Sequence, residues 1–122
     1  MTALDEPQRQ QLRTRLAQRQ AELLRELGQF QRDRLDVAAQ ESAHEVIDQA
    51  EVAERRERED VGEAEATRDH DELVAVRAAL ERMDDGSYGE CIDCGVDIGF
   101  ARLSAQPAAA RCLPCQEKAE RR

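Results

Sequence analysis

All four cysteines of this 122-residue chain lie in two CxxC motifs near its C-terminal end. The motifs are Cys91-Ile-Asp-Cys94 and Cys112-Leu-Pro-Cys115, and seventeen residues separate them. Each CxxC turn directs two sulfur atoms toward one point, and a tetrahedral zinc ion needs two such turns that face each other. The spacing therefore predicts that Cys91, Cys94, Cys112 and Cys115 bind one zinc ion. Because cysteine fills all four positions, no position is left for water, which is typical of a structural zinc site.

Two other uses of the cysteines remain open at this point, namely two disulfide bonds or a redox-active dithiol. A redox CxxC motif usually occurs once, within a βαβ pattern, and this chain has no such pattern. The N-terminal residues show no signal-peptide features, and no apolar stretch approaches membrane-spanning length. We therefore expect a cytoplasmic protein that makes no membrane contact. Disulfides are rare in that compartment, so zinc is the favoured interpretation.

The composition indicates long helices instead of a large globular core. Charged residues make up 37% of the chain, and only 2% of its residues are aromatic. Such a chain can bury a narrow apolar stripe along a helix but little more. The formal net charge is -9, which repels the phosphates of DNA and RNA over most of the surface. We therefore expect contacts with protein and no direct binding of DNA.

Two stretches have the composition and periodicity of long helices. The first follows Pro7, a residue that suits the first turn of a helix, and runs from 8 to about 40. The second runs from about 52 to 83, and Asp84-Asp-Gly86 ends it. Each stretch carries one heptad-like apolar seam. The seam residues are Leu12, Leu16, Leu23, Leu27, Phe30 and Val37 in the first stretch, and Leu73, Val76, Leu80 and Met83 in the second.

Neither stretch can bury its apolar stripe alone, so we expect the two to pair as an antiparallel coiled-coil hairpin. The hairpin would occupy residues 8–84, after a disordered lead at 1–7, with its turn near 43–49 and its tip near 43–53. Pairing residues equidistant from the turn places Phe30 opposite Gly62, a large side chain against none. The alternative is one continuous helix, which would imply a dimeric coiled coil. The favoured hairpin predicts a mainly all-α monomer.

Residues 85–122 are expected to form a small four-cysteine zinc-finger lobe with a short C-terminal helix. Gly95 and Gly99 allow the tight turns that direct thiolates and backbone amides toward a metal. A few apolar side chains supply the cover of this lobe, and the residues from Pro114 to Arg122 are expected to be helical. The apolar cover consists of Ile98, Phe100 and Leu103.

The same stretch resembles the DksA/TraR family of bacterial RNA polymerase-binding transcription factors. The family pattern has an aromatic-glycine step into C-x-x-C-G-x-x-I, then R-L-x-A-x-P, then C-x-x-C. Here Tyr88-Gly leads into Cys91-Ile-Asp-Cys-Gly-Val-Asp-Ile98, followed by Arg102-Leu-Ser-Ala-Gln-Pro107 and Cys112-Leu-Pro-Cys115. The resemblance covers roughly the last 38 residues closely, and the helical hairpin before them matches in architecture.

The resemblance implies a regulator that binds RNA polymerase directly and inserts its hairpin tip in the secondary channel to modulate initiation, commonly together with the alarmone ppGpp. Full-length members carry D-x-x-D-x-A at the tip, and an ungapped count from Cys91 places Asp48-Gln-Ala-Glu51-Val-Ala53 there. Asp48 and Ala53 match the motif, whereas Glu51 is one methylene longer than the family's Asp. Without the resemblance, Asp48 and Glu51 would be ordinary solvated helix residues.

Two other function classes compete with the polymerase regulator. One is a zinc-stapled coiled-coil adaptor or dimerisation protein, which needs only the apolar seam. The other is a thiol-based redox sensor, which needs a thiolate with solvent access. The sequence contains no nucleophile next to a base, no glycine-rich phosphate loop and no open metal site, so we predict that the protein is not an enzyme.

Overall fold

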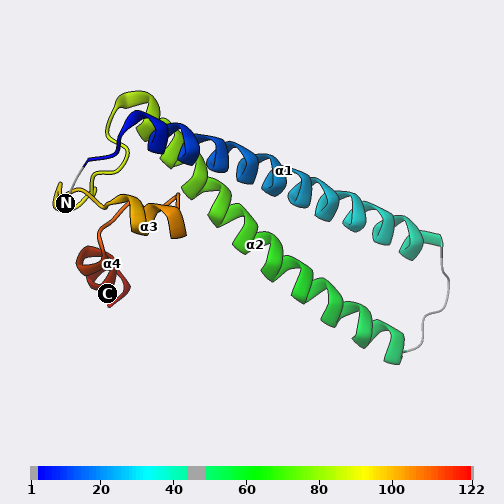
Figure 1. Cartoon of the computed structure of the whole chain (residues 1–122). Helices are drawn as coiled ribbons and strands as arrows, with labels where there is room; N and C mark the ends of the chain where they lie inside the picture. The colour runs from blue at the N-terminus through cyan, green and yellow to red at the C-terminus, as the bar shows by residue number, and fades with distance from the viewer. Residues whose placement is uncertain (1–2, 44–48, 122) are drawn as a thin grey trace. The chain divides into compact units, whose positions relative to one another are not determined.

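The computed structural model describes residues 3–43 and 49–121, and these residues form four helices (Figure 1). They are α1 (Glu6–Ala43), α2 (Gln49–Asp85), α3 (Phe100–Ala105) and α4 (Leu113–Glu120). Within the described residues, β pairing is limited to an isolated bridge between Glu90 and Asp97. The mainly all-α class is therefore confirmed. No helix in the described ranges is long and apolar enough to cross a membrane.

Helix α1 begins one residue before Pro7, at Glu6, because Asp5 caps it. The Asp5 carboxylate accepts a hydrogen bond from the backbone N–H of Gln8 at 2.9 Å, and the Gln8 side chain accepts one from the N–H of Asp5 at 3.0 Å. This reciprocal pair is a capping box. Leu4, just before the cap, is buried. The expected disordered lead at 1–7 is thus wrong for residues 3–7, since an apolar anchor and a cap order them.

The two long helices form an antiparallel hairpin, as the sequence predicts. Helix α1 ends at Ala43 and α2 begins at Gln49, which brackets the expected turn; residues 44–48 lie outside the described residues. The Phe30 ring lies 3.2 Å from the position of a Cβ added at Gly62. In one continuous helix these residues would lie about 48 Å apart at 1.5 Å per residue. The contact confirms the predicted pairing of Phe30 with Gly62 and excludes the continuous-helix alternative.

The chain divides into two compact units, and the division falls within both long helices. The first unit comprises residues 1–21 and 74–122, and the second comprises residues 22–73. The sequence instead predicts a boundary between residues 84 and 85. In the first unit, the start of α1 and the end of α2 therefore belong with the cysteine lobe.

The first unit contains most of the buried apolar residues in the described part of the chain. Its helices are also joined by polar contacts, because Arg13 pairs with Asp84 at 3.1 Å and the Arg15 guanidinium donates to the backbone carbonyl of Ser104 at 2.6 Å. Helix α3, which the sequence did not predict, supplies Leu103, a residue with no exposed surface. The buried side chains of this unit are Leu4, Leu12, Leu16, Val76, Ala79, Tyr88, Cys91, Ile98 and Leu103.

The second unit is only thinly packed. Leu23 and Leu73 are its buried apolar residues in the described part of the chain. Phe30 adds an aromatic contact with Gly62, and the Arg34 guanidinium lies 5.8 Å from the centre of the Phe30 ring. Arg34 also approaches the Glu63 carboxylate at 3.8 Å. The side chain of Val37, the last predicted seam residue of α1, lies outside the described residues.

Candidate metal centre

The chain leaves α2 through a hydrogen-bonded turn that leads directly into the first cysteine motif. The Asp85 carboxylate accepts hydrogen bonds from the hydroxyl and the N–H of Ser87, and these bonds lower its pKa. The backbone N–H groups of Ser87 and Tyr88 both donate to the carbonyl of Arg82. The Tyr88 hydroxyl donates to the carbonyl of Pro107 at 2.7 Å, which ties this turn to the segment before the second motif.

The first CxxC motif is a tight turn closed by backbone hydrogen bonds. The N–H of Cys91 donates to the carbonyl of Val96 at 2.8 Å, and the N–H of Gly95 donates back to the carbonyl of Cys91 at 2.9 Å. Gly95 has a φ of 79°, a conformation that side-chain-bearing residues rarely adopt. The turn that the sequence predicts at Gly95 is therefore present.

The second CxxC motif opens helix α4. Cys112 is the N-cap of this helix, and its carbonyl accepts a hydrogen bond from the N–H of Gln116 at 2.9 Å. Pro114 lies in the first turn, where its missing N–H leaves no donor unpaired. The predicted C-terminal helix is confirmed, with bounds of Leu113–Glu120. Helix formation thus fixes the backbone between Cys112 and Cys115.

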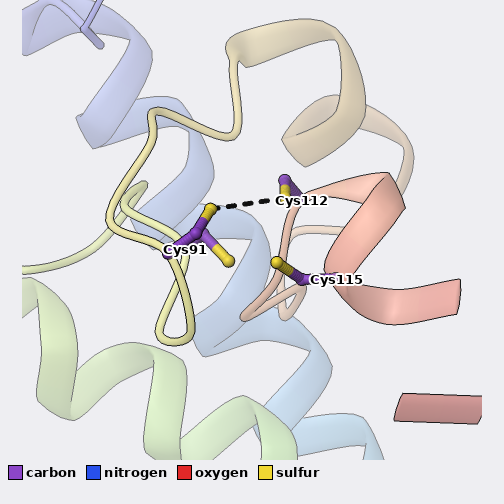
Figure 2. Close-up of side chains that lie close together, drawn as sticks. Cys91, Cys112 and Cys115 are labelled. Atoms are coloured by element: carbon purple, nitrogen blue, oxygen red, sulfur yellow. Dashed lines mark hydrogen bonds between the residues drawn. The ribbon is translucent and has the colours of Figure 1, made fainter. Parts of the chain in front are cut away.

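The four sulfur atoms converge on one point. They all lie within 4.8 Å of one another, and the sulfurs of Cys94 and Cys112 are 3.7 Å apart. Figure 2 shows the side chains of Cys91, Cys112 and Cys115 gathered between the two motifs. Four sulfurs at about 2.3 Å from a tetrahedral zinc would be about 3.8 Å from one another, whereas a disulfide would need about 2 Å. The geometry fits zinc, and all four cysteines are free of disulfides.

The protonation of the cysteines shows why this cluster needs a cation. Burial raises the pKa of the Cys91 thiol, but N–H groups of Cys112, Cys94 and Asp93 donate to its sulfur, and the net pKa is lowered to about 6. The hydrogen bond with Cys112 and burial raise the pKa of Cys115 to about 12. Four adjacent thiolates repel one another, so they ionise together only around a positive ion. We conclude that the cluster binds one structural zinc ion.

Three charged residues that sequence reasoning missed join the two motifs. The Arg111 guanidinium donates to the Asp93 carboxylate at 2.7 Å, and Arg102 donates from α3 to the backbone carbonyl of Arg111 at 3.0 Å. Opposite charges inside one CxxC motif and just before the other were the only signal in the sequence. That signal is weak because it appears at surface positions with no periodicity.

The predicted tip residues lie far along the chain from this centre. Asp48 lies outside the described residues, whereas Glu51 and Ala53 are exposed in the first turns of α2. Their contact with polymerase therefore stays a prediction. Of the two histidines, His44 is also outside the described residues, and His70 is an exposed residue 3.8 Å from Asp71.

Comparison with known proteins gives a family for the cysteine lobe. The model of the prokaryotic dksA/traR C4-type zinc finger matches residues 86–121. The RNA polymerase-binding transcription factor DksA of Caulobacter vibrioides is 46% identical over 50 residues, which are 41% of this chain and 35% of that protein. The protein of the same name from Escherichia coli K12 is 38% identical over 48 residues, 39% of this chain and 32% of that protein. The matched region thus spans about a third of these relatives.

Solved structures extend the likeness to the helical hairpin. Transcription factor DksA2 from Pseudomonas aeruginosa has a TM-score of 0.77 and 28% identity, covering 96% of this chain and 86% of that one. The RNA polymerase binding protein Dks from Chlamydia trachomatis has a TM-score of 0.58 and 24% identity, covering 98% of this chain and 94% of that one, and supports the fold alone. Residues 86–121 thus match the dksA/traR C4-type zinc finger, and the hairpin that accompanies them has the fold of transcription factor DksA2.

Proposed function

We propose that this protein is a transcription regulator that binds RNA polymerase directly and inserts the tip of its hairpin in the secondary channel to modulate initiation. The observation that carries the proposal is the extent of the likeness to transcription factor DksA2. It includes the hairpin as well as the zinc finger, since it covers 96% of this chain and 86% of that one. The curated relatives matched through the zinc finger are also RNA polymerase-binding transcription factors by name.

The distribution of charge supports insertion of the hairpin. The unit at residues 22–73 contains 17 acidic and 7 basic residues, a net charge of -10. The remainder of the chain contains 10 acidic and 11 basic residues, a net charge of +1. The whole excess of negative charge therefore lies on residues 22–73, the unit that contains the turn of the hairpin. An acidic rod suits a pore that leads to magnesium and basic side chains, because opposite charges steer and hold it there.

The proposed contact residues are Asp48, Glu51 and Ala53. Glu51 is exposed in the first turn of α2, where its carboxylate is accessible to a partner. The zinc finger has a structural part in this proposal, since its four thiolates fill the zinc coordination shell and leave no position for a substrate. The protein would thus act as a non-catalytic monomer, with ppGpp as a second ligand at the polymerase interface and without direct contact to DNA.

The test is binding of the purified zinc-loaded protein to bacterial core RNA polymerase, with competition by a known secondary-channel factor. We expect binding that the competitor abolishes. Binding that the competitor leaves unchanged would place the protein elsewhere on polymerase and contradict the channel proposal. Absence of binding would favour the zinc-stapled adaptor, which needs only the helical seam.

One observation keeps the thiol-sensor alternative open. Cys94 is an exposed residue, whereas Cys91 is buried, so an oxidant could approach the cluster from the side of Cys94. The sensor alternative requires that mild oxidation releases zinc and that reduction restores binding. Zinc retained under an oxidant that modifies exposed control thiols would exclude it.

A further inference from the structure

Two residues that are not zinc ligands connect the cysteine motifs through their side chains. Asp93 lies inside the first motif, and Arg111 directly precedes the second. The Nε atom of Arg111 donates to Oδ2 of Asp93 at 2.7 Å, the short distance typical of a charge-assisted hydrogen bond. We call this pair the Asp93–Arg111 bridge. It spans the two halves of the metal centre at a place where the chain between them is seventeen residues long.

The bridge connects two peptide groups that act on the same sulfur. The backbone N–H groups of Asp93 and of Cys112, the residue after Arg111, both act to lower the pKa of the Cys91 thiol. Cys91 is the most deeply buried of the four cysteines, with 3% of its surface exposed. Hydrogen bonds from backbone amides stabilise a thiolate and orient it toward a metal. Separation of residues 93 and 111 would therefore move the two motifs apart, and with them the peptide groups of Asp93 and Cys112.

Arg111 is itself held from two further directions. Its backbone carbonyl accepts a hydrogen bond from Nε of Arg102 in α3 at 3.0 Å. The carbonyl of the preceding residue, Ala110, accepts a hydrogen bond from the N–H of Ile92 at 2.9 Å. Hydrogen bonds thus already fix the backbone near both ends of the bridge. Formation of the side-chain pair therefore costs little additional conformational entropy.

We propose that Asp93 and Arg111 are positioning residues of the zinc site: by holding the two CxxC motifs together, their bridge keeps the four sulfur atoms close to one another and slows the release of zinc. The pair is partly exposed, with 47% of the Asp93 side chain and 33% of the Arg111 side chain accessible. An ion pair of this exposure contributes little to global stability. Its effect is therefore expected on metal retention, not on helix content.

The test measures the rate at which the full-length zinc-loaded protein loses zinc to an excess of a colorimetric chelator. Asp93→Asn and Arg111→Gln each remove the bridge and are expected to release zinc about tenfold faster than the wild type. This factor is the lower end of the range for substitutions of residues that support metal ligands. The two changes combined should release zinc no faster than either alone, because they break the same contact. Arg111→Lys keeps the positive charge and should give an intermediate rate.

The matched control is Arg13→Gln, which removes another ion pair of the same unit, 3.1 Å from Asp84, without touching either motif. It should leave the release rate unchanged. The cobalt(II)-loaded proteins distinguish a positioning role from a merely structural one. Their thiolate charge-transfer absorption should shift in the Asp93 and Arg111 variants and should not shift in the control. Raising the salt concentration should speed release from the wild type more than from Arg111→Gln, because salt screens an exposed ion pair.

Two results would overturn the proposal. One is a release rate for Asp93→Asn and Arg111→Gln equal to that of Arg13→Gln. The other is an equal response to salt in the wild type and in Arg111→Gln. If Arg111→Gln does not fold, the isosteric Asp93→Asn replaces it in both comparisons. Its rate of zinc release is then compared with that of Arg13→Gln, and its response to salt with that of the wild type. The outcome does not depend on polymerase binding, so it stands apart from the proposed function.

Discussion

The ring of Phe30 in α1 lies 3.2 Å from the position that a Cβ at Gly62 in α2 would occupy. Glycine inside a helix costs about 1 kcal/mol relative to alanine. Gly62 therefore lowers the stability of α2 but lets the Phe30 ring of α1 approach closely. Gly28, in the middle of α1, faces only the far end of the Arg32 side chain, at 3.5 Å. The two glycines thus differ in what a methyl group would meet.

We expect Gly28→Ala to raise the free energy of unfolding by about 0.5–1 kcal/mol and Gly62→Ala to raise it less, because the added methyl group displaces the Phe30 ring. Denaturant unfolding followed by circular dichroism measures both. In a Phe30→Ala background, Gly62→Ala should become as favourable as Gly28→Ala. An equal effect of Gly62→Ala in both backgrounds would mean that the ring does not restrict this position.

Leu4 should anchor the start of α1 to the cysteine lobe. Its Cδ1 atom lies 3.3 Å from the position that a Cβ added at Gly89 would occupy, and Leu4 is 8% exposed. Leu4→Ala is expected to lower the free energy of unfolding of the first unit by about 2 kcal/mol, the lower end for a buried leucine. Leu35→Ala, at a residue that is 70% exposed, is the control and should change it by less than about 0.5 kcal/mol. Equal effects of the two changes would contradict an anchoring role.

The single tyrosine gives a pH-dependent signal from the lobe. Burial raises the pKa of Tyr88 from 10.0 to about 12. Because the folded pKa is the higher one, the stabilisation is fully present below pH 10 and is lost as pH rises toward 12. Ultraviolet absorbance of tyrosinate should titrate near pH 12 in the zinc-loaded protein and near pH 10 after unfolding. A native titration near pH 10 would contradict the burial of the hydroxyl.

Tyr88→Phe tests the hydrogen bond to the Pro107 carbonyl separately. The change should lower the free energy of unfolding by about 1 kcal/mol at neutral pH, because it leaves the carbonyl without this donor. It should also remove the part of the stability loss between pH 10 and 12 that Tyr88 causes. Chemical denaturation at pH 8 and pH 11 measures both effects. An unchanged stability at pH 8 would show that water replaces the hydroxyl at no cost.

Zinc removal should disorder the lobe before the long helices. Elemental analysis should find one zinc per chain, and Cys112→Ser should reduce it strongly because a hydroxyl is a poor zinc ligand. Chelation should collapse the dispersed nuclear magnetic resonance signals of residues 86–121, while signals of residues 22–43 and 49–73 change little. A metal-free protein whose spectrum equals that of the zinc-loaded protein at neutral pH would contradict a structural zinc.

The proposed tip residues can be separated from the scaffold by paired substitutions. Asp48→Asn should leave folding and polymerase binding nearly intact and reduce the effect on transcription in vitro. Glu51→Asp should change the size of that effect, because it shortens a side chain that acts over a fixed reach. Glu65→Gln removes an exposed carboxylate elsewhere on α2 and should have no such effect. Unchanged transcription with Asp48→Asn would contradict the tip assignment.

The sequence by itself determined the metal and the pairing of the helices. Two CxxC motifs at this separation identify a zinc site, because one zinc ion with four thiolate ligands accounts for all four cysteines. The seam and the two helix lengths place the turn, and the turn in an antiparallel hairpin sets the pairing of Phe30 with Gly62. These features depend on local periodicity, which a sequence displays directly.

Only the tertiary structure decided how the lobe is held together. The burial of Leu4, the short helix α3 and the Asp93–Arg111 bridge all depend on contacts between residues distant in the chain. A single leucine before a helix cap and one opposite-charge pair have no periodicity, so their partners become visible only once the fold brings them together. The sequence thus contains the ligands of the zinc site, and the folded chain decides which neighbours position them.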